Sequence, residues 1–202
     1  MLLELRRTKV EFSPGFIIVV TLMLLFFDEK IVLLSVLSSL LHEGGHLFAI
    51  RLSGEKIEKV VFGAFGLRIE RCAFTKISYK SEVLIALGGI AVNYIIFLLS
   101  LVIYLVFRSD IAAIFGIINL FVGLFNSVPV KSLDMGKALQ NLLKSKRSEE
   151  NAERIANAVS FIFSLCFLVM TVFYCVIFGL NFSLIAVSLY LLSETELKIY
   201  GK

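Results

Sequence analysis

Apolar residues occur in long runs along this chain, and short polar segments separate the runs. A helix that spans a bilayer needs about 20 mostly apolar residues. Several of the runs reach or approach that length, so the pattern predicts about six membrane-crossing helices. We place them near residues 14–27, 31–52, 82–107, 111–128, 155–178 and 180–193.

Polar residues mark the ends of several predicted helices. Ser13-Pro14 is expected to open the first helix, because proline is tolerated in a first helical turn. Asp28-Glu29-Lys30 and Arg108-Ser109-Asp110 are expected to form short turns between helices. Ser148, which two glutamates follow, is expected to cap the fifth helix.

Residues 57–71 have a different composition from the rest of the chain. β-Branched and aromatic residues are frequent there, and Gly63 and Gly66 suit a turn between two strands. We predict a small membrane-associated β-hairpin in this segment. The predicted fold class is an all-α polytopic membrane protein of about six transmembrane helices with this hairpin, in a single domain over residues 1–202.

The composition supports a membrane protein. The chain is 58% hydrophobic and its mean hydropathy is +0.92, which is too apolar for a soluble domain of this length. We expect no cleavable signal peptide, because the first apolar run lacks a small-residue cleavage site and leads directly into the second. Cys72, Cys166 and Cys175 form no CxxC pair, and we expect no disulfide between them.

The distribution of positive charge predicts the orientation. Of the 20 Lys and Arg residues, all but Lys30 and Arg108 lie in the two tails or in the connections after the second and fourth spans. By the positive-inside rule, both termini and these two connections are cytoplasmic. A multi-pass protein of the cytoplasmic membrane is therefore expected. A basic surface that binds nucleic acid is disfavoured, because the charges alternate with membrane spans.

Both histidines of the chain lie in one short motif within the second apolar run, His42-Glu43-Gly44-Gly45-His46. On a helix, this H-E-x-x-H pattern places two imidazoles on one face, where they can bind one zinc ion. The adjacent Glu43 carboxylate can take a proton from a water that the metal polarises. Ionisable side chains cost roughly 2.5 kcal/mol or more each at membrane depth, so such a motif is rarely kept there without a use.

A zinc site needs a third protein ligand, and with no further histidine it should be a carboxylate or a cysteine. Asp134 is favoured because it follows a break in an apolar run at Pro129, and a new helical stretch is expected after Gly136. Irregular backbone at membrane depth is tolerated where it is buried in protein or lines a polar cavity. The other acidic residues near apolar segments are Glu70, Glu82, Asp110, Glu194 and Glu196.

Three motifs together resemble the site-2 protease family of intramembrane zinc metalloproteases. The first is the H-E-x-x-H motif on an early span. The second resembles the family's Asn-x-x-Pro-x-Pro-x-Leu-Asp-Gly-Gly pattern and keeps Asn126, Pro129, Leu133, Asp134 and Gly136. The third, Gly89 to Asn93, resembles Gly-Pro-x-x-Asn. The chain departs from these patterns at Ile90, Lys131 and Met135, and the resemblance covers about residues 31–140.

The resemblance implies a catalytic core at about 31–140 in which His42, His46 and Asp134 hold zinc and Glu43 is the general base. It also implies that Asn93, Asn126 and Pro129 line the substrate cleft, although both asparagines could instead bridge helices by hydrogen bonds. The expected substrate is a membrane-spanning or membrane-associated protein within the lipid bilayer. The 57–71 hairpin either caps the bundle or offers an edge strand to an unwound substrate. The six-span core is similar to the branch of sporulation factor-processing proteases.

Two other functions are considered. A non-proteolytic zinc-binding membrane protein, or a pseudoprotease that acts as a sensor or substrate binder, would have no need of Glu43. A zincin of another branch would take its third ligand from Glu149, Glu150 or Glu153, which lie in a polar cytoplasmic stretch and are therefore disfavoured.

Overall fold

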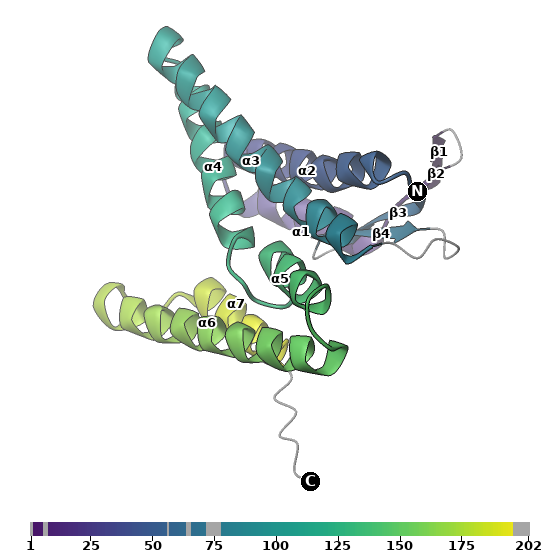
Figure 1. Ribbon diagram of the computed structural model, residues 1–202. Helices are drawn as coiled ribbons and strands as arrows, with labels where there is room; N and C mark the ends of the chain where they lie inside the picture. The colour runs from purple at the N-terminus through teal and green to yellow at the C-terminus, as the bar shows by residue number, and fades with distance from the viewer. Residues whose placement is uncertain (1, 6–7, 56, 64–65, 72–77, 196–202) are drawn as a thin grey trace. The chain divides into compact units, whose positions relative to one another are not determined.

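The computed structural model describes residues 2–5, 8–55, 57–63, 66–71 and 78–195 of the chain. The described chain is mostly helical, with one small sheet near its N-terminus (Figure 1). The strands are β1 (Leu2–Leu5), β2 (Thr8–Phe12), β3 (Ile57–Gly63) and β4 (Gly66–Arg71). The helices are α1 (Pro14–Phe26), α2 (Glu29–Leu52), α3 (Tyr79–Phe107), α4 (Asp110–Asn126), α5 (Asp134–Lys144), α6 (Glu149–Phe178) and α7 (Phe182–Ser193).

The chain forms two compact units. The first combines Met1–Ile77 with Gly88–Gly123, and the second combines Ser78–Leu87 with Leu124–Lys202. The first unit therefore contains the sheet, α1, α2 and most of α3 and α4. The second contains the first turns of α3, the end of α4, and α5 to α7.

The sheet of the first unit has the strand order β1-β2-β3-β4. β3 and β4 pair antiparallel within the segment predicted as a hairpin, and β2 pairs with β3 in parallel, with Lys9 opposite Lys59. Lys59 Nζ also lies 2.9 Å from Glu11 Oε2 across that pair. Strands β1 and β2, which pair antiparallel with Leu5 opposite Thr8, were not predicted from the sequence. The parallel pairing of β2 with β3 joins segments about fifty residues apart, so it leaves no local sequence signal.

Local sequence sets the start of α1 as predicted, whereas α2 begins at Glu29 within the segment predicted as a turn. Ser13 caps α1, its hydroxyl oxygen accepting from Phe16 N–H at 3.3 Å, with Pro14 in the first turn. Asp28 caps α2, because its Oδ1 accepts from the N–H groups of Lys30 and Ile31. Ser148 is also the N-cap residue of α6, although its side chain makes no capping hydrogen bond. Capping satisfies backbone donors that a helix leaves unpaired at its first turn.

Small residues bring the helices of the first unit into close contact. Gly45 of α2 faces Gly88 of α3, and a methyl group on Gly88 would lie 2.6 Å from the Gly45 carbonyl oxygen. Farther along α3, a methyl group on Gly116 of α4 would lie 3.0 Å from Ser100 Cβ. Small residues allow backbones to approach closely where apolar helices pack in a membrane. This close approach of α2 to α3 brings His42 and His46 next to α3.

The second unit has a small apolar core. Val130, Leu133 and Leu191 are buried there. Ser164 of α6 donates to the Leu191 carbonyl of α7 at 3.1 Å. The side chains that surround these three residues are Phe125, Val128, Phe167 and Val187.

Three of the predicted spans, α2, α3 and α6, are long and apolar enough to cross a membrane. The other three, α1, α4 and α7, are shorter apolar helices of 13, 17 and 12 residues. The chain is a membrane protein, and its crossing by six spans stays a prediction, as does its single-domain organisation. Cys166 and Cys175 are free thiols, and Cys72 lies outside the described residues.

Candidate metal centre

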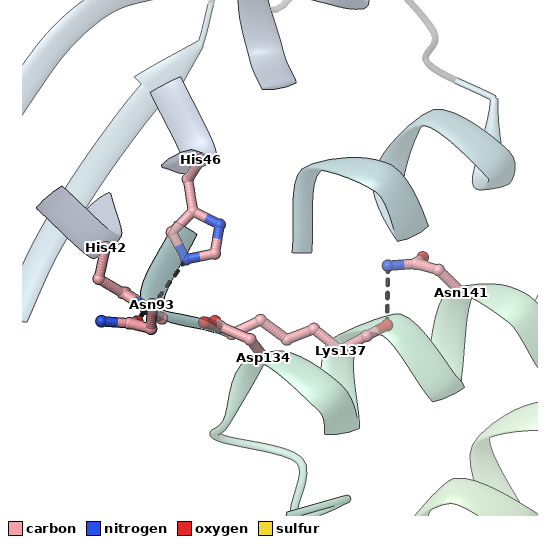
Figure 2. Close-up of polar contacts among 6 residues, drawn as sticks. All are labelled: His42, His46, Asn93, Asp134, Lys137 and Asn141. Carbon is pink, nitrogen blue, oxygen red and sulfur yellow. Dashed lines mark hydrogen bonds and ion pairs between the residues drawn. The ribbon is translucent and has the colours of Figure 1, made fainter. Parts of the chain in front are cut away.

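His42 and His46 converge within the first unit, as their spacing predicts. One turn of α2 separates them, so both rings lie on one face of the helix. Their Nε2 atoms are 3.2 Å apart and the rings meet edge to face, with centroids 4.9 Å apart. Both side chains are buried. Figure 2 shows His42 and His46 extending from the helix toward Asn93.

The separation of the two nitrogens fits a zinc ion. Zinc takes tetrahedral ligands, and Zn–N bonds of 2.0–2.1 Å place two ligand nitrogens about 3.3 Å apart. The two Nε2 atoms are 3.2 Å apart. Two neutral imidazoles are also the donors that zinc commonly binds in proteins. The histidine pair therefore meets the requirement of a shared zinc ion in donor type and spacing.

Gly89 leaves the space around these nitrogens open. A methyl group on Gly89 of α3 would lie 2.5 Å from His46 Nε2 and 2.7 Å from His42 Nε2. Any side chain at this position would press on the atoms that could hold a metal. The Gly89–Asn93 motif therefore needs glycine at its first position, because a larger residue would collide with the two histidine rings.

Asn93 of α3 contacts His42. Its Oδ1 forms a hydrogen bond with His42 Nδ1, the ring nitrogen that does not face His46. Its amide nitrogen donates to Asn119 Oδ1 of α4 at 2.9 Å, and the residue is fully buried. Asn93 therefore bridges three helices, which was one of the two roles considered for it. Its role toward a substrate stays a prediction.

Asp134 is the first residue of α5 in the second unit, and its side chain is 7% exposed. Leu133 occupies the N-cap position and makes no side-chain capping bond. The new helical stretch thus begins at Asp134, two residues before Gly136 and earlier than predicted. Asp134 Oδ1 lies 3.2 Å from Lys137 Nζ on the next turn (Figure 2).

The segment before Asp134 explains the spacing of its motif. The backbone turns tightly around Pro129, where the Val130 N–H donates to the Val128 carbonyl at 2.8 Å. The buried Val130 and Leu133 side chains fix the segment to the core of the second unit. Gly136 is required because a methyl group there would collide with the Val130 carbonyl. These contacts place Asp134 at a fixed point at the start of α5.

The Lys131 N–H of the same segment has a partner on another helix. It donates to Ser160 Oγ of α6 at 3.0 Å. An unpaired backbone N–H would be costly in a segment with buried neighbours. Lys131 replaces the proline that is usual in the family pattern, and its backbone N–H, which proline would lack, is used here.

Comparison with known proteins identifies the fold of the chain. No protein-family model matches the chain. The solved structure of the site-2 protease from Methanocaldococcus jannaschii is similar, with a TM-score of 0.68 over 97% of this chain and 93% of that one, at 24% identity. The chain has the site-2 protease fold. The resemblance that the sequence motifs indicated is confirmed.

A curated relative is similar to most of the chain. The zinc metalloprotease MJ0392 of Methanocaldococcus jannaschii is 27% identical over 164 residues, which are 79% of this chain. The match covers 46% of the relative, so the chain spans about half the length of that protein.

Within the site-2 protease fold, the remaining predicted residues occupy distinct places. Glu43 follows His42 on α2 and is half-buried. Asn126 is the last residue of α4, and Pro129 lies in the turn that follows; both are half-buried. Their assignments as general base and as substrate-binding residues stay predictions.

The alternative third ligands lie at more accessible positions. Glu82 is half-buried near the start of α3. The exposed ones are Asp110, Glu149, Glu150, Glu153 and Glu194. The Glu70 side chain and Glu196 lie outside the described residues. Among the acidic side chains that the structure does describe, Asp134 alone is buried.

Ser38 and Asn119, which were not predicted from the sequence, form hydrogen bonds with Asn93 and with each other. Both are fully buried, Ser38 on α2 and Asn119 on α4. A signal was present, because Asn119 is a strongly polar residue inside an otherwise apolar helix. Polar residues in such helices face the protein interior.

Proposed function

We propose that this chain is an intramembrane zinc metalloprotease that hydrolyses peptide bonds of membrane-spanning or membrane-associated proteins. The proposal depends above all on one observation. Two histidines on an apolar, membrane-length helix converge at the spacing of zinc ligands, beside a glutamate in the H-E-x-x-H order. The site-2 protease fold supports it.

In this proposal, His42 and His46 bind zinc through Nε2, and Asp134 supplies the third ligand through a carboxylate oxygen. The burial of all three side chains supports this donor set. Two imidazoles and one carboxylate are a known catalytic set, which leaves one position for water or substrate. Bound zinc lowers the pKa of water toward neutrality and polarises a carbonyl group.

The protein's own residues then handle the protons. The Glu43 carboxylate accepts a proton from the attacking water and returns it to the amine that leaves the cleaved peptide bond. Glu43 separates the proposed protease from a pseudoprotease, since a protein that only binds zinc needs no base beside its ligands.

A substrate must present an extended backbone, because a helix hides its peptide groups in intrahelical hydrogen bonds. In the sheet order, β3 pairs on both sides and β4 is an edge strand. An edge strand offers unpaired N–H and C=O groups to an added strand. We therefore propose that β4 receives the unwound segment, and that Asn126 and Pro129 contact it near the scissile bond.

Zinc content tests the metal site first. Detergent-purified wild type and Glu43→Gln should each contain about one zinc per chain, because Glu43 is not a ligand. Asp134→Ala should lose most of it. Wild type without zinc, with its fold intact, would count against the protease and favour the pseudoprotease. Full zinc retention in Asp134→Ala would remove Asp134 from the ligand set.

Proteolysis tests the activity. Because Glu43→Gln should bind substrates without cleaving them, proteins that copurify with it can be offered to the wild type. Cleavage by the wild type and none by Glu43→Gln supports the proposal, whereas equal cleavage by both removes Glu43 as the base.

We also propose that both termini are cytoplasmic, from the charge distribution. A reporter that is active only outside the cytoplasm should be inactive when fused to the C-terminus. An active reporter there would overturn this topology.

A further inference from the structure

A fully buried chain of hydrogen bonds runs behind the histidine pair, within the first unit. Its members are Ser38 of α2, Asn93 of α3 and Asn119 of α4, each 0% exposed. Asn119 Oδ1 accepts from the Ser38 hydroxyl at 3.0 Å and from Asn93 Nδ2 at 2.9 Å. Asn93 Oδ1 in turn faces His42 Nδ1.

The direction of this chain is set at one end by the backbone. Asn119 Nδ2 donates to the Phe115 carbonyl of its own helix at 2.8 Å. A backbone carbonyl can only accept, so the atom of Asn119 that faces it must be the amide nitrogen. The other atom, Oδ1, therefore faces Ser38 and Asn93 and accepts from both.

This direction passes through Asn93 to His42. Since Asn119 presents an acceptor, Asn93 must turn its Nδ2 toward Asn119 and its Oδ1 toward His42. A flipped Asn93 would place two oxygens about 2.9 Å apart and leave buried polar groups unsatisfied, at a cost of roughly 1–3 kcal/mol for each group. His42 Nδ1 must then carry the hydrogen, so that Nε2, which faces His46, is the unprotonated nitrogen.

We infer that Asn119 is a positioning residue, which acts through Asn93 to hold His42 in the tautomer that binds metal. Resting on the proposed zinc site, the inference adds a reason why His42 binds through Nε2. An asparagine alone does not specify a tautomer, because its amide can present either a donor or an acceptor. The Phe115 carbonyl removes that ambiguity through Asn119.

A substitution that removes the hydrogen-bond donor and acceptor of Asn119 without adding a charge tests the inference. Asn119→Leu keeps the branching of the side chain but removes its donor and acceptor, so that Asn93 can flip. We expect zinc affinity, measured by competition with a chelator, to fall by about 10- to 100-fold, the range for residues that orient metal ligands. Asn157→Leu on α6 is the matched control, and it should stay within about threefold of wild type.

A rescue separates positioning from packing. Aspartate at position 93 presents acceptors in both orientations, so it holds the His42 Nδ1 hydrogen without help from Asn119. Asn93→Asp combined with Asn119→Leu should recover most of the affinity that Asn119→Leu loses. No recovery in the double variant, with its fold intact, would mean that Asn119 acts by packing and would overturn the inference.

The tautomer itself can be read in the metal-free protein. The chain has 2 histidines, so 15N-histidine labelling gives few ring signals, and His46→Gln leaves those of His42 alone. With the ring neutral, wild-type His42 should carry its hydrogen on Nδ1, and Asn119→Leu should show both tautomers. Protonation at Nε2 in the wild type would overturn the inference even if Asn119→Leu does not fold.

These measurements distinguish the inference from the proposed function. Wild type that binds no zinc but carries the His42 hydrogen on Nδ1 would defeat the zinc protease and support the hydrogen-bond chain. Wild type that binds zinc, with Asn119→Leu unchanged in tautomer and affinity, would defeat the inference alone.

Discussion

Gly89→Ala tests how closely α3 approaches the histidine pair. The added methyl group would lie 2.5 Å from His46 Nε2 and 2.7 Å from His42 Nε2. Ordinary van der Waals contact begins near 3.4 Å, so His46 Nε2 would have to retreat by about 0.9 Å. Metal–ligand distances tolerate only about 0.2 Å. The substitution should therefore disturb the metal site directly.

The expected loss follows from the cost of overpacking. Inserting a methyl group into a filled site costs about 1–3 kcal/mol. If that strain is relieved in the metal-free protein and returns when both nitrogens converge, zinc affinity should fall by about 5- to 150-fold. The assay is competition between the detergent-purified protein and a chelator of known affinity.

Gly44→Ala is the control for this prediction. A methyl group on Gly44 would meet no atom of the described structure within 4 Å. Alanine also favours a helix interior by about 1 kcal/mol over glycine, so this variant should fold and bind zinc like the wild type. Zinc affinity of Gly89→Ala within about twofold of Gly44→Ala would refute the close approach of α3 to the histidines.

Three further predictions concern the packing and charge around the site. Gly45→Ala should lower the thermal unfolding midpoint, because its methyl group would collide with the Gly88 backbone and lie 2.8 Å from Val92 Cγ2, and a midpoint equal to the wild type would contradict the contact. Gly136→Ala should lower the free energy of unfolding by about 1–3 kcal/mol, because backbone atoms of the preceding turn occupy the space where its methyl group would lie. Stability equal to the wild type in thermal unfolding would disprove this backbone contact. Lys137→Met should tighten zinc binding by up to about fivefold, because it removes a partly exposed ion pair with Asp134 worth up to about 1 kcal/mol. Lys137→Arg keeps the charge and should leave zinc binding unchanged. Weaker binding in Lys137→Met would show that Lys137 supports Asp134 as a ligand.

The sequence determined those features that depend on neighbouring residues. Apolar runs located all six of the predicted helices to within a few residues, except that α6 begins at Glu149, earlier than its apolar part. The four-residue spacing of His42 and His46 places both on one helical face wherever that helix packs. The capping of α1 by Ser13 is equally local.

Tertiary structure decided which distant residues meet. The parallel pairing of β2 with β3 depends on contacts between segments about fifty residues apart, as in the pair Lys9 and Lys59. The need for glycine at 89 follows from the approach of α3 to the histidines. A sequence shows a small residue at such a position but not what lies against it.

The role of Asn119 shows the limit of sequence most clearly. Its polarity within an apolar helix already required a buried partner, because lipid offers none. That its oxygen meets Asn93 and Ser38, and that its nitrogen meets the Phe115 carbonyl, depends on how α2, α3 and α4 pack. Sequence thus determined that hydrogen bonds must form, and the packing of the helices decided which atoms donate and which accept.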